Sequence, residues 1–192
     1  PTAPWRSAMT LPRELVLRQA GGQTWVASQP ARELLALQQP ATLDRANLTM
    51  AHGQALDLSA ALAGTGGRLV LNLSTAALRG FTLTFGNDAG EALQLGYDAA
   101  TAQWWIDRRH SGRVDFHASF AGRHHAPRLA NVPAADLQLW FDATSVELFA
   151  DGGLSTMTSL FFPQRPWTRL SLVAPDGITL DALRLQPLRD PR

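Results

Sequence analysis

Three carboxylates gather in one short stretch late in the chain: Asp142, Glu147 and Asp151, in and beside the segment TSVELFADGG. Two carboxylates can act as general acid and nucleophile in hydrolysis of a glycosidic bond, provided that they lie about 5–5.5 Å apart in a retaining enzyme. Glu147 and Asp151 are four residues apart, so in an extended strand their Cα atoms are separated by roughly 13 Å. That separation argues against a catalytic pair.

The same stretch is better explained as a β-hairpin. A turn at residues 143–144 gathers the apolar side chains of both strands on one face, in the register Phe141–Val146, Trp140–Glu147 and Leu139–Leu148. Asp142 and Asp151 then become turn residues, where Asp commonly bonds nearby backbone amides. We therefore assign no catalytic residue to this chain.

Trp140 and Glu147 share the opposite face of this predicted hairpin. An aromatic ring can stack on the apolar face of a sugar while a carboxylate accepts hydrogen bonds from its hydroxyls, so the pair is a candidate carbohydrate-binding site. The alternative, which we favour, is that Trp140 packs under a loop or against another domain, because exposed tryptophan is uncommon and usually has a partner.

The segment QWWIDRRH presents the same choice. Alternation places one of Trp104 and Trp105 in the core and the other outward. With Trp105 outward, Asp107 and Arg108 could bind a sugar hydroxyl beside it. They could equally form a surface ion pair, which would contribute little to stability, and we favour this second interpretation.

No pattern in the chain predicts a metal or a cofactor. There is no cysteine, and the chain has five histidines. Two of them, His124 and His125, fall in a segment that we expect to be a polar loop, and adjacent histidines make poor joint zinc ligands on a strand because they point to opposite faces. The sequence also lacks the G-x-S-x-G motif of a serine hydrolase and a phosphate-binding loop.

Composition narrows the class of protein further. The chain has 192 residues, 45% hydrophobic and 17% charged, as expected for a globular domain with a sizeable core. Its formal charge is +1 and its arginines are interleaved with acids, which argues against nucleic acid as a partner. No apolar run approaches the roughly 20 residues of a membrane span. The first residues lack the pattern of a signal peptide, and since they do not begin with Met we expect a processed or excised piece.

Period-two alternation of apolar and polar residues dominates the sequence, interrupted by Gly- and Asp-rich turns. We predict an all-β fold, a two-sheet antiparallel β-sandwich of the jelly-roll or lectin-like kind over residues 40–188. One short connecting helix is expected at 31–39, and a frayed polar tail at 189–192. The apolar positions assigned to the core are Leu69, Leu71, Leu73, Phe81, Leu83, Phe85, Leu93, Leu95, Tyr97, Leu137, Leu139, Phe141, Val146 and Leu148.

Residues 1–30 differ in character. They hold two strand-like runs, 14–19 and 23–28, separated by Gly21-Gly22. Two strands alone do not make a stable unit, so they must pair with the sandwich or with a part outside this chain.

Four segments, in the same order, resemble glycoside hydrolase family 32, which includes levanases, inulinases and invertases. PWRSAMTLPREL resembles the end of the family's catalytic propeller. The other three, VASQPARELLAL, WWIDRRHSG and LQLWFDATSVELFADGGLSTMTSLFFP, resemble the linker and the C-terminal β-sandwich that follow it. The family's nucleophile lies in a Trp-Met-Asn-Asp-Pro-type motif and its acid/base in a Glu-Cys motif, and both are absent here. The family's third motif, Arg-Asp-Pro, occurs at 189–191, but after the sandwich rather than far upstream.

The resemblance implies a non-catalytic sandwich module of a β-fructofuranosidase or levanase, supporting a catalytic propeller of the same enzyme. The alternative is an independent fructan-binding module, with fructan or fructose as ligand. An extracellular or periplasmic location is expected for such an enzyme. Residues 1–13 would then lack their propeller neighbours, so we expect this arm to be poorly ordered or packed against a second molecule in a homodimer, with Trp5, Met9, Leu11 and Leu15 losing burial.

Overall fold

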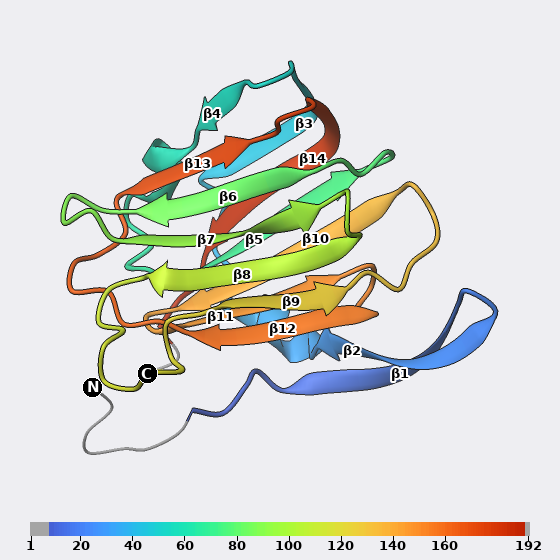
Figure 1. Ribbon diagram of the computed structural model, residues 1–192, viewed down its shortest axis with the longest axis horizontal. Coiled ribbons are helices and arrows are strands. Elements are labelled where there is room, and N and C mark those ends of the chain that lie inside the picture. The colour runs from blue at the N-terminus through green and yellow to red at the C-terminus, as the bar shows by residue number, and fades with distance from the viewer. Residues whose placement is uncertain (1–7, 191–192) are drawn as a thin grey trace.

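The computed structural model describes residues 8–190 and is built almost entirely from antiparallel strands (Figure 1). Two six-stranded sheets have the orders β12-β11-β10-β5-β14-β3 and β4-β13-β6-β7-β8-β9, and β1 and β2 form a separate two-stranded ribbon. We call the first sheet the rear sheet and the second the front sheet, as they lie in Figure 1. The predicted two-sheet β-sandwich is confirmed.

The strands and helices follow one another along the chain with short connections. Their bounds are β1 Arg13–Ala20, β2 Gln23–Pro30, η1 Arg32–Leu37, β3 Leu43–Met50, β4 Ala55–Asp57, η2 Ser59–Leu62, β5 Leu69–Thr75, β6 Phe81–Gly86, β7 Ala92–Asp98, β8 Gln103–His110, β9 Arg123–Pro127, β10 Ala135–Asp142, β11 Ser145–Ala150, β12 Ser155–Leu160, β13 Arg169–Val173 and β14 Ile178–Pro187.

The core lies between the two sheets. Every apolar position that alternation assigned to it belongs to one buried cluster, together with Trp104, Ile106, Phe161 and residues of β13 and β14. Leu83, Leu95 and Leu139 have no exposed surface at all. Alternation locates this core because the side chains of a strand point in turn to the two faces of its sheet.

The hairpin of β10 and β11 has the predicted register: Phe141 pairs with Val146, Trp140 with Glu147, and Leu139 with Leu148. The same β10 residues continue across β5, so Trp140 lies opposite Val70 as well. The apolar face of the hairpin lines the core, and Trp140 and Glu147 lie on the outer face of the rear sheet.

The ribbon confirms the two strands expected near the N-terminus. Gly21 and Gly22 form its turn with φ of +58° and +75°, a backbone conformation that glycine adopts without steric cost. The ribbon extends beyond the sandwich in Figure 1, and its second strand is fixed to the rear sheet by a 2.9 Å hydrogen bond from the Ser28 N–H to the Gly153 carbonyl.

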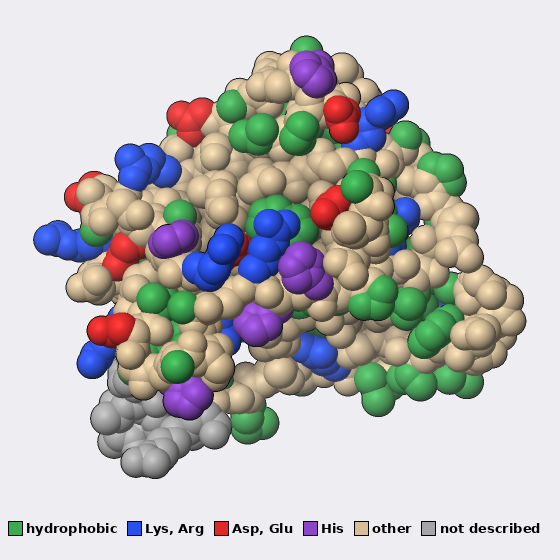
Figure 2. Space-filling model, in the orientation of Figure 1, with side chains coloured by type: hydrophobic (Ala, Val, Ile, Leu, Met, Phe, Trp, Pro, Cys, Tyr) green, Lys and Arg blue, Asp and Glu red, His purple; other side chains and the backbone are tan. Residues whose placement is uncertain are grey.

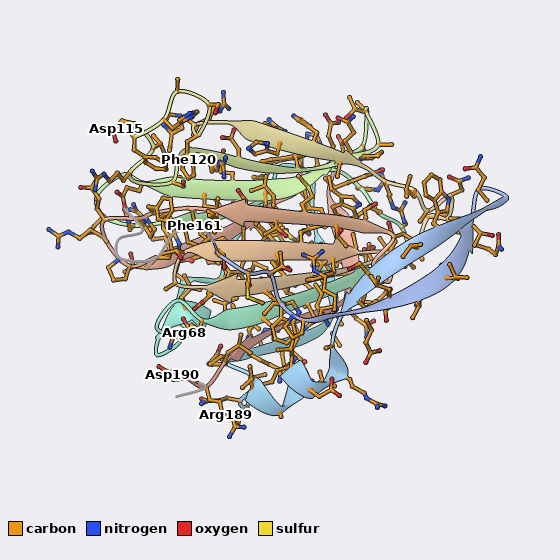
Figure 3. The ribbon with its side chains drawn as sticks, turned by 90° about the horizontal axis from the view of Figure 1, so that it is seen from below. Arg68, Asp115, Phe120, Phe161, Arg189 and Asp190 are labelled. Carbon is orange, nitrogen blue, oxygen red and sulfur yellow. The ribbon has the colours of Figure 1, made fainter. Side chains whose placement is uncertain are left out.

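The predicted short connecting helix is the 3-10 helix η1, with hydrogen bonds of the i→i+3 type at both ends. Two other local expectations need correction. His124 and His125 lie in strand β9 rather than a polar loop, because the edge of β8 supplies backbone partners for them. Residue 190 is held rather than frayed, since Arg68 forms a 2.8 Å salt bridge with Asp190 (Figure 3).

Candidate functional site

Glu147 links the outer face of the rear sheet to the N-terminal segment. One carboxylate oxygen accepts a 2.6 Å hydrogen bond from the Leu11 N–H, and the other accepts from the guanidinium of Arg13. The same guanidinium donates to the Thr158 hydroxyl at 2.9 Å and lies over the ring of Phe149. Glu147 is 4% exposed, so this is a buried anchor for the start of β1.

The other two carboxylates of the opening stretch are engaged in the same way. Asp151 forms a buried bidentate ion pair with Arg128, at 2.8 and 2.9 Å. The hydrogen bonds that Arg128 donates to Asp151 raise the pKa of its guanidinium, in spite of its burial. Asp142 pairs with Arg68 at 3.0 Å on the surface. Each carboxylate therefore has its own arginine, and this stretch contains no acid/base pair.

Trp140 is buried by the N-terminal part of its own chain. It is 3% exposed and forms a small apolar cluster with Val70 and Phe149, covered by Leu11, Leu34 and Leu188. Its indole N–H donates to the Gln138 side chain at 2.8 Å. Packing beneath a loop was the alternative that the sequence analysis favoured for this residue.

The expected loss of burial by the N-terminal arm is wrong for Leu11 and correct for Met9 and Leu15. Leu11 is half-buried against its own sandwich, and Arg13 is paired. The reason is that the outer face of the rear sheet offers both an apolar surface and a carboxylate. Met9 is fully exposed, at 98%, as expected. Trp5 and Arg6 lie outside the described residues.

The candidates on β8 point to opposite faces of the front sheet. Trp104 lies in the core and Trp105 on the outer face, as predicted, but the Arg123 guanidinium covers the Trp105 ring at 3.9 Å from its centroid. Asp107 pairs with Arg109 at 2.5 Å rather than with Arg108. Residues 107 and 109 share a face, whereas residue 108 does not, so the expected 107–108 pair does not form.

Arg108 contacts the segment that precedes β9 and the end of β12. It donates a 2.7 Å hydrogen bond to the Phe120 carbonyl and lies 4.0 Å from the centroid of the Phe120 ring. Burial lowers its pKa. Burial alone would raise the pKa of Asp107, but its hydrogen bonds with Arg109 outweigh burial and hold the pKa below its usual value. Figure 2 shows arginine and histidine side chains gathered over the middle of this front face.

The ribbon carries three of the seven exposed large hydrophobic residues in the described part of the chain. Leu15 and Leu17 of β1 and Val26 of β2 lie on one of its faces and are 69%, 74% and 64% exposed. Hydrophobic side chains line the lower edge of this projection in Figure 2. We call these three residues the ribbon face. Exposed apolar patches of this kind mark interaction sites.

Neither a metal centre nor a membrane span is evident in residues 8–190. No group of three or more His, Asp and Glu side chains there is arranged to hold a metal ion. No helix in the same range is long and apolar enough to cross a membrane.

Within residues 8–190 the chain is thus a two-sheet sandwich with an anchored ribbon, and Glu147, Asp142 and Asp151 each pair with an arginine. The family model for the C-terminal region of glycosyl hydrolases family 32 matches residues 23–187. The chain therefore belongs to the family of C-terminal domains of glycosyl hydrolases of family 32, as the four segments indicated.

Individual relatives agree with this assignment. The chain is 32% identical to an extracellular exo-inulinase of Aspergillus ficuum over 94% of its own length and 34% of the inulinase. It is 29% identical to a levanase of Bacillus subtilis, over 98% of its length and 28% of the levanase. The crystal structure of the exo-inulinase from Aspergillus awamori superposes with a TM-score of 0.84 at 28% identity, covering 99% of this chain and 37% of that one. The chain thus spans about a third of the length of these relatives.

Sequence reasoning did not find the partners of the candidate residues. Arg13 and Glu147 are 134 residues apart, and no local pattern pairs them. The sequence also does not indicate the close approach of Ser28 to Gly153. Its only sign is the glycine pair of the DGG turn, since a backbone without side chains allows another strand to approach closely.

Proposed function

We propose that this chain is the non-catalytic C-terminal module of an extracellular fructan- or sucrose-hydrolysing glycosidase, and that its partner is the catalytic domain of the same protein. The observation that carries the proposal is the ribbon face: Leu15, Leu17 and Val26 are exposed on a ribbon that the sandwich holds by its other face. The relatives, which are about three times as long, supply the context of a larger enzyme.

The ribbon suits a docking role for two physical reasons. Burying its apolar side chains contributes about 25 cal/mol per Å² of apolar surface removed from water. The outer edge of β1 also has no strand beside it within residues 8–190, so its backbone groups are available to extend a sheet of the catalytic domain. Both contributions require the ribbon to keep a fixed orientation relative to the sandwich.

The anchor at Glu147 supplies that rigidity. Arg13 and Leu11 are fixed to β11 on one side, and Ser28 is fixed to Gly153 on the other. The ribbon is therefore tied to the sandwich at the beginning of β1 and near the end of β2. In this proposal the module buttresses the catalytic domain and sets its orientation.

Substitution of the ribbon face tests the proposal in a protein that contains both domains. Leu15→Asp combined with Leu17→Asp should separate the thermal transitions of the two domains and lower the midpoint of the catalytic domain. Ala46→Asp, an exposed change on β3, is the matched control and should leave both transitions unchanged. A single, unshifted transition in the double variant would count against docking through this face.

The ribbon face could instead pair with a second copy of the chain, as the sequence analysis considered. Sedimentation of the 192-residue chain separates the two cases. A dimer that the Leu15→Asp, Leu17→Asp variant dissociates would support self-association in place of docking on a catalytic domain.

Fructan binding is the second candidate function. One observation favours it, a cleft on the outer face of the rear sheet that is lined by polar side chains. The earlier candidates support it less well: Arg123 covers Trp105, Asp107 is paired with Arg109, and Arg13 occupies Glu147.

A further inference from the structure

A cleft of about 420 Å³ lies between the outer face of the rear sheet and the elements that overhang it. Its floor is formed by β10, β5 and β14, and its wall by the end of β2 and by η1. The turn at 152–153 forms its lip. Its volume falls within the ~300–1,000 Å³ range of small-molecule sites.

The floor is an ordered array of polar side chains. The strand register places Gln138 of β10 beside Asn72 of β5, and Asp136 of β10 beside Ser74. On the far side of β5, Ala182 of β14 lies opposite Ser74 and Arg184 lies opposite Asn72. The facing positions of β10 and β5 thus present two amides in one row and a carboxylate and a hydroxyl in the next.

Several of these groups have hydrogen-bonding capacity to spare. Within residues 8–190, the side chains of Asn72 and Ser74 make no hydrogen bond. Gln138 accepts from the Trp140 indole through its oxygen, which leaves its NH₂ group to donate. Asp136 accepts from the Gly152 N–H through one oxygen, and the other remains available.

Apolar groups enclose this polar floor. Trp140 and Phe149 close the inner end of the cleft, and Leu35 of η1 faces it from the wall with 58% of its surface exposed. Two carboxylates, Glu14 and Asp136, line the cleft against one guanidinium, that of Arg32, so its charges do not favour an anion. Paired amides and hydroxyls between apolar walls match a neutral polyhydroxyl ligand, whose hydroxyls donate and accept and whose ring carbons are apolar.

We propose that this cleft binds one or two sugar residues of a neutral oligosaccharide. Resting on the proposed function, the oligosaccharide is a short fructan chain. Asn72 and the NH₂ group of Gln138 bind its hydroxyls, and Leu35 contacts its ring carbons. The module thereby holds a fructan strand on the rear sheet, in addition to supporting the catalytic domain.

Calorimetric or NMR titration of the 192-residue chain with 1-kestose, a fructose-containing trisaccharide, tests this proposal. Asn72→Ala should weaken binding about fivefold, as expected for one hydrogen bond to an uncharged group. Ala182→Trp should abolish it, because the ring would fill the floor beside Ser74. Gln94→Ala is the matched control: it removes an outward amide from the front sheet, where Gln94 donates to Thr84, and should leave binding unchanged.

The possible results separate this proposal from the proposed function. Absence of 1-kestose binding, or binding that neither Asn72→Ala nor Ala182→Trp weakens, overturns the proposal that the cleft binds sugar. Neither result affects the proposal that the ribbon face docks on a catalytic domain. Binding of maltotriose in preference to 1-kestose overturns the assignment to fructan and counts against the proposed function as well. Circular dichroism of each variant shows whether the sandwich is intact.

Discussion

Glu147 of β11 forms an ion pair with Arg13 at the start of β1, across 134 residues of sequence, and also accepts the Leu11 N–H at 2.6 Å. A carboxylate whose type and position suggested catalysis is thus the point where the N-terminal segment is fastened to the sandwich. This attachment fixes the ribbon, and with it the ribbon face, on the sandwich.

Glu147→Ala should release the ribbon from the rear sheet. The substitution removes the carboxylate that pairs with the partly buried Arg13 guanidinium and accepts the Leu11 N–H, at a cost of about 2 kcal/mol. Hydrogen exchange of the ribbon amides should then accelerate about 30-fold, while the amides of β5 and β6 exchange as before. The control is Asp142→Ala, which removes an exposed partner of Arg68 and should change exchange little. Equal protection of the ribbon in the Glu147→Ala variant would exclude the anchoring role.

Gly153→Ala should weaken the second attachment of the ribbon. Gly153 has φ of +85°, and a Cβ atom there would lie 2.2 Å from the Ser28 carbonyl oxygen, so β2 must move. We expect a loss of about 1–3 kcal/mol in the free energy of unfolding. Gly64→Ala provides the comparison, because Gly64 has φ of +78° but open space around it. Urea denaturation of both variants isolates the clash, and equal losses would mean that contact with Ser28 is unimportant.

The Arg128–Asp151 ion pair should be the most costly one to break. Both side chains are at least nine-tenths buried, and Arg128 also donates to the carbonyls of Val132 and Ala134. Arg128→Ala leaves a buried carboxylate unpaired and should cost about 3–5 kcal/mol. Arg184→Ala, which removes an exposed pair with Asp44 at 3.5 Å, should cost less than about 0.5 kcal/mol. Similar unfolding midpoints for the two variants would refute this ranking.

Acidification should destabilise the module through His124. Burial, followed by the charges of Arg108 and His125, lowers its pKa below the usual value of 6.5. A lowered pKa means that the folded state binds the proton less readily than the unfolded chain. The stabilising contribution is therefore complete above pH 6.5 and is lost as the pH falls through the folded-state pKa. His124→Gln should flatten the dependence of the melting temperature on pH between neutral and mildly acidic conditions. An unchanged slope of melting temperature against pH would show that His124 is not responsible for the loss of stability in acid.

Alternation predicted the fold because burial on one face of a strand is a local property of the sequence. Leu69, Leu83 and Leu139 could be placed in the core without knowledge of their partners, and even the β10–β11 register followed from matching apolar faces. The same reasoning missed β9, whose RHHAP sequence has no alternation. That strand exists because β8 offers it a hydrogen-bonding edge.

The site was less predictable because its partners are distant in sequence. Trp140 was recognised as an outward aromatic, but nothing local shows that Leu11, Leu34 and Leu188 cover it. Asp107 was paired with its neighbour Arg108 by proximity in sequence, whereas the face of the strand determines that its partner is Arg109. The cleft was missed altogether, since it depends on η1 and β2 overhanging β5 and β10.

Fructose release from sucrose, inulin and levan by the purified 192-residue chain decides whether the carboxylates of the opening stretch are catalytic. They are engaged by Arg13, Arg68 and Arg128, so we expect no release above the buffer blank by the chain alone. We expect activity only from a protein that also contains the proposed catalytic domain. Release of fructose by the isolated chain that disappears in Glu147→Gln or Asp151→Asn would show that these residues are catalytic and that the proposed non-catalytic role is wrong.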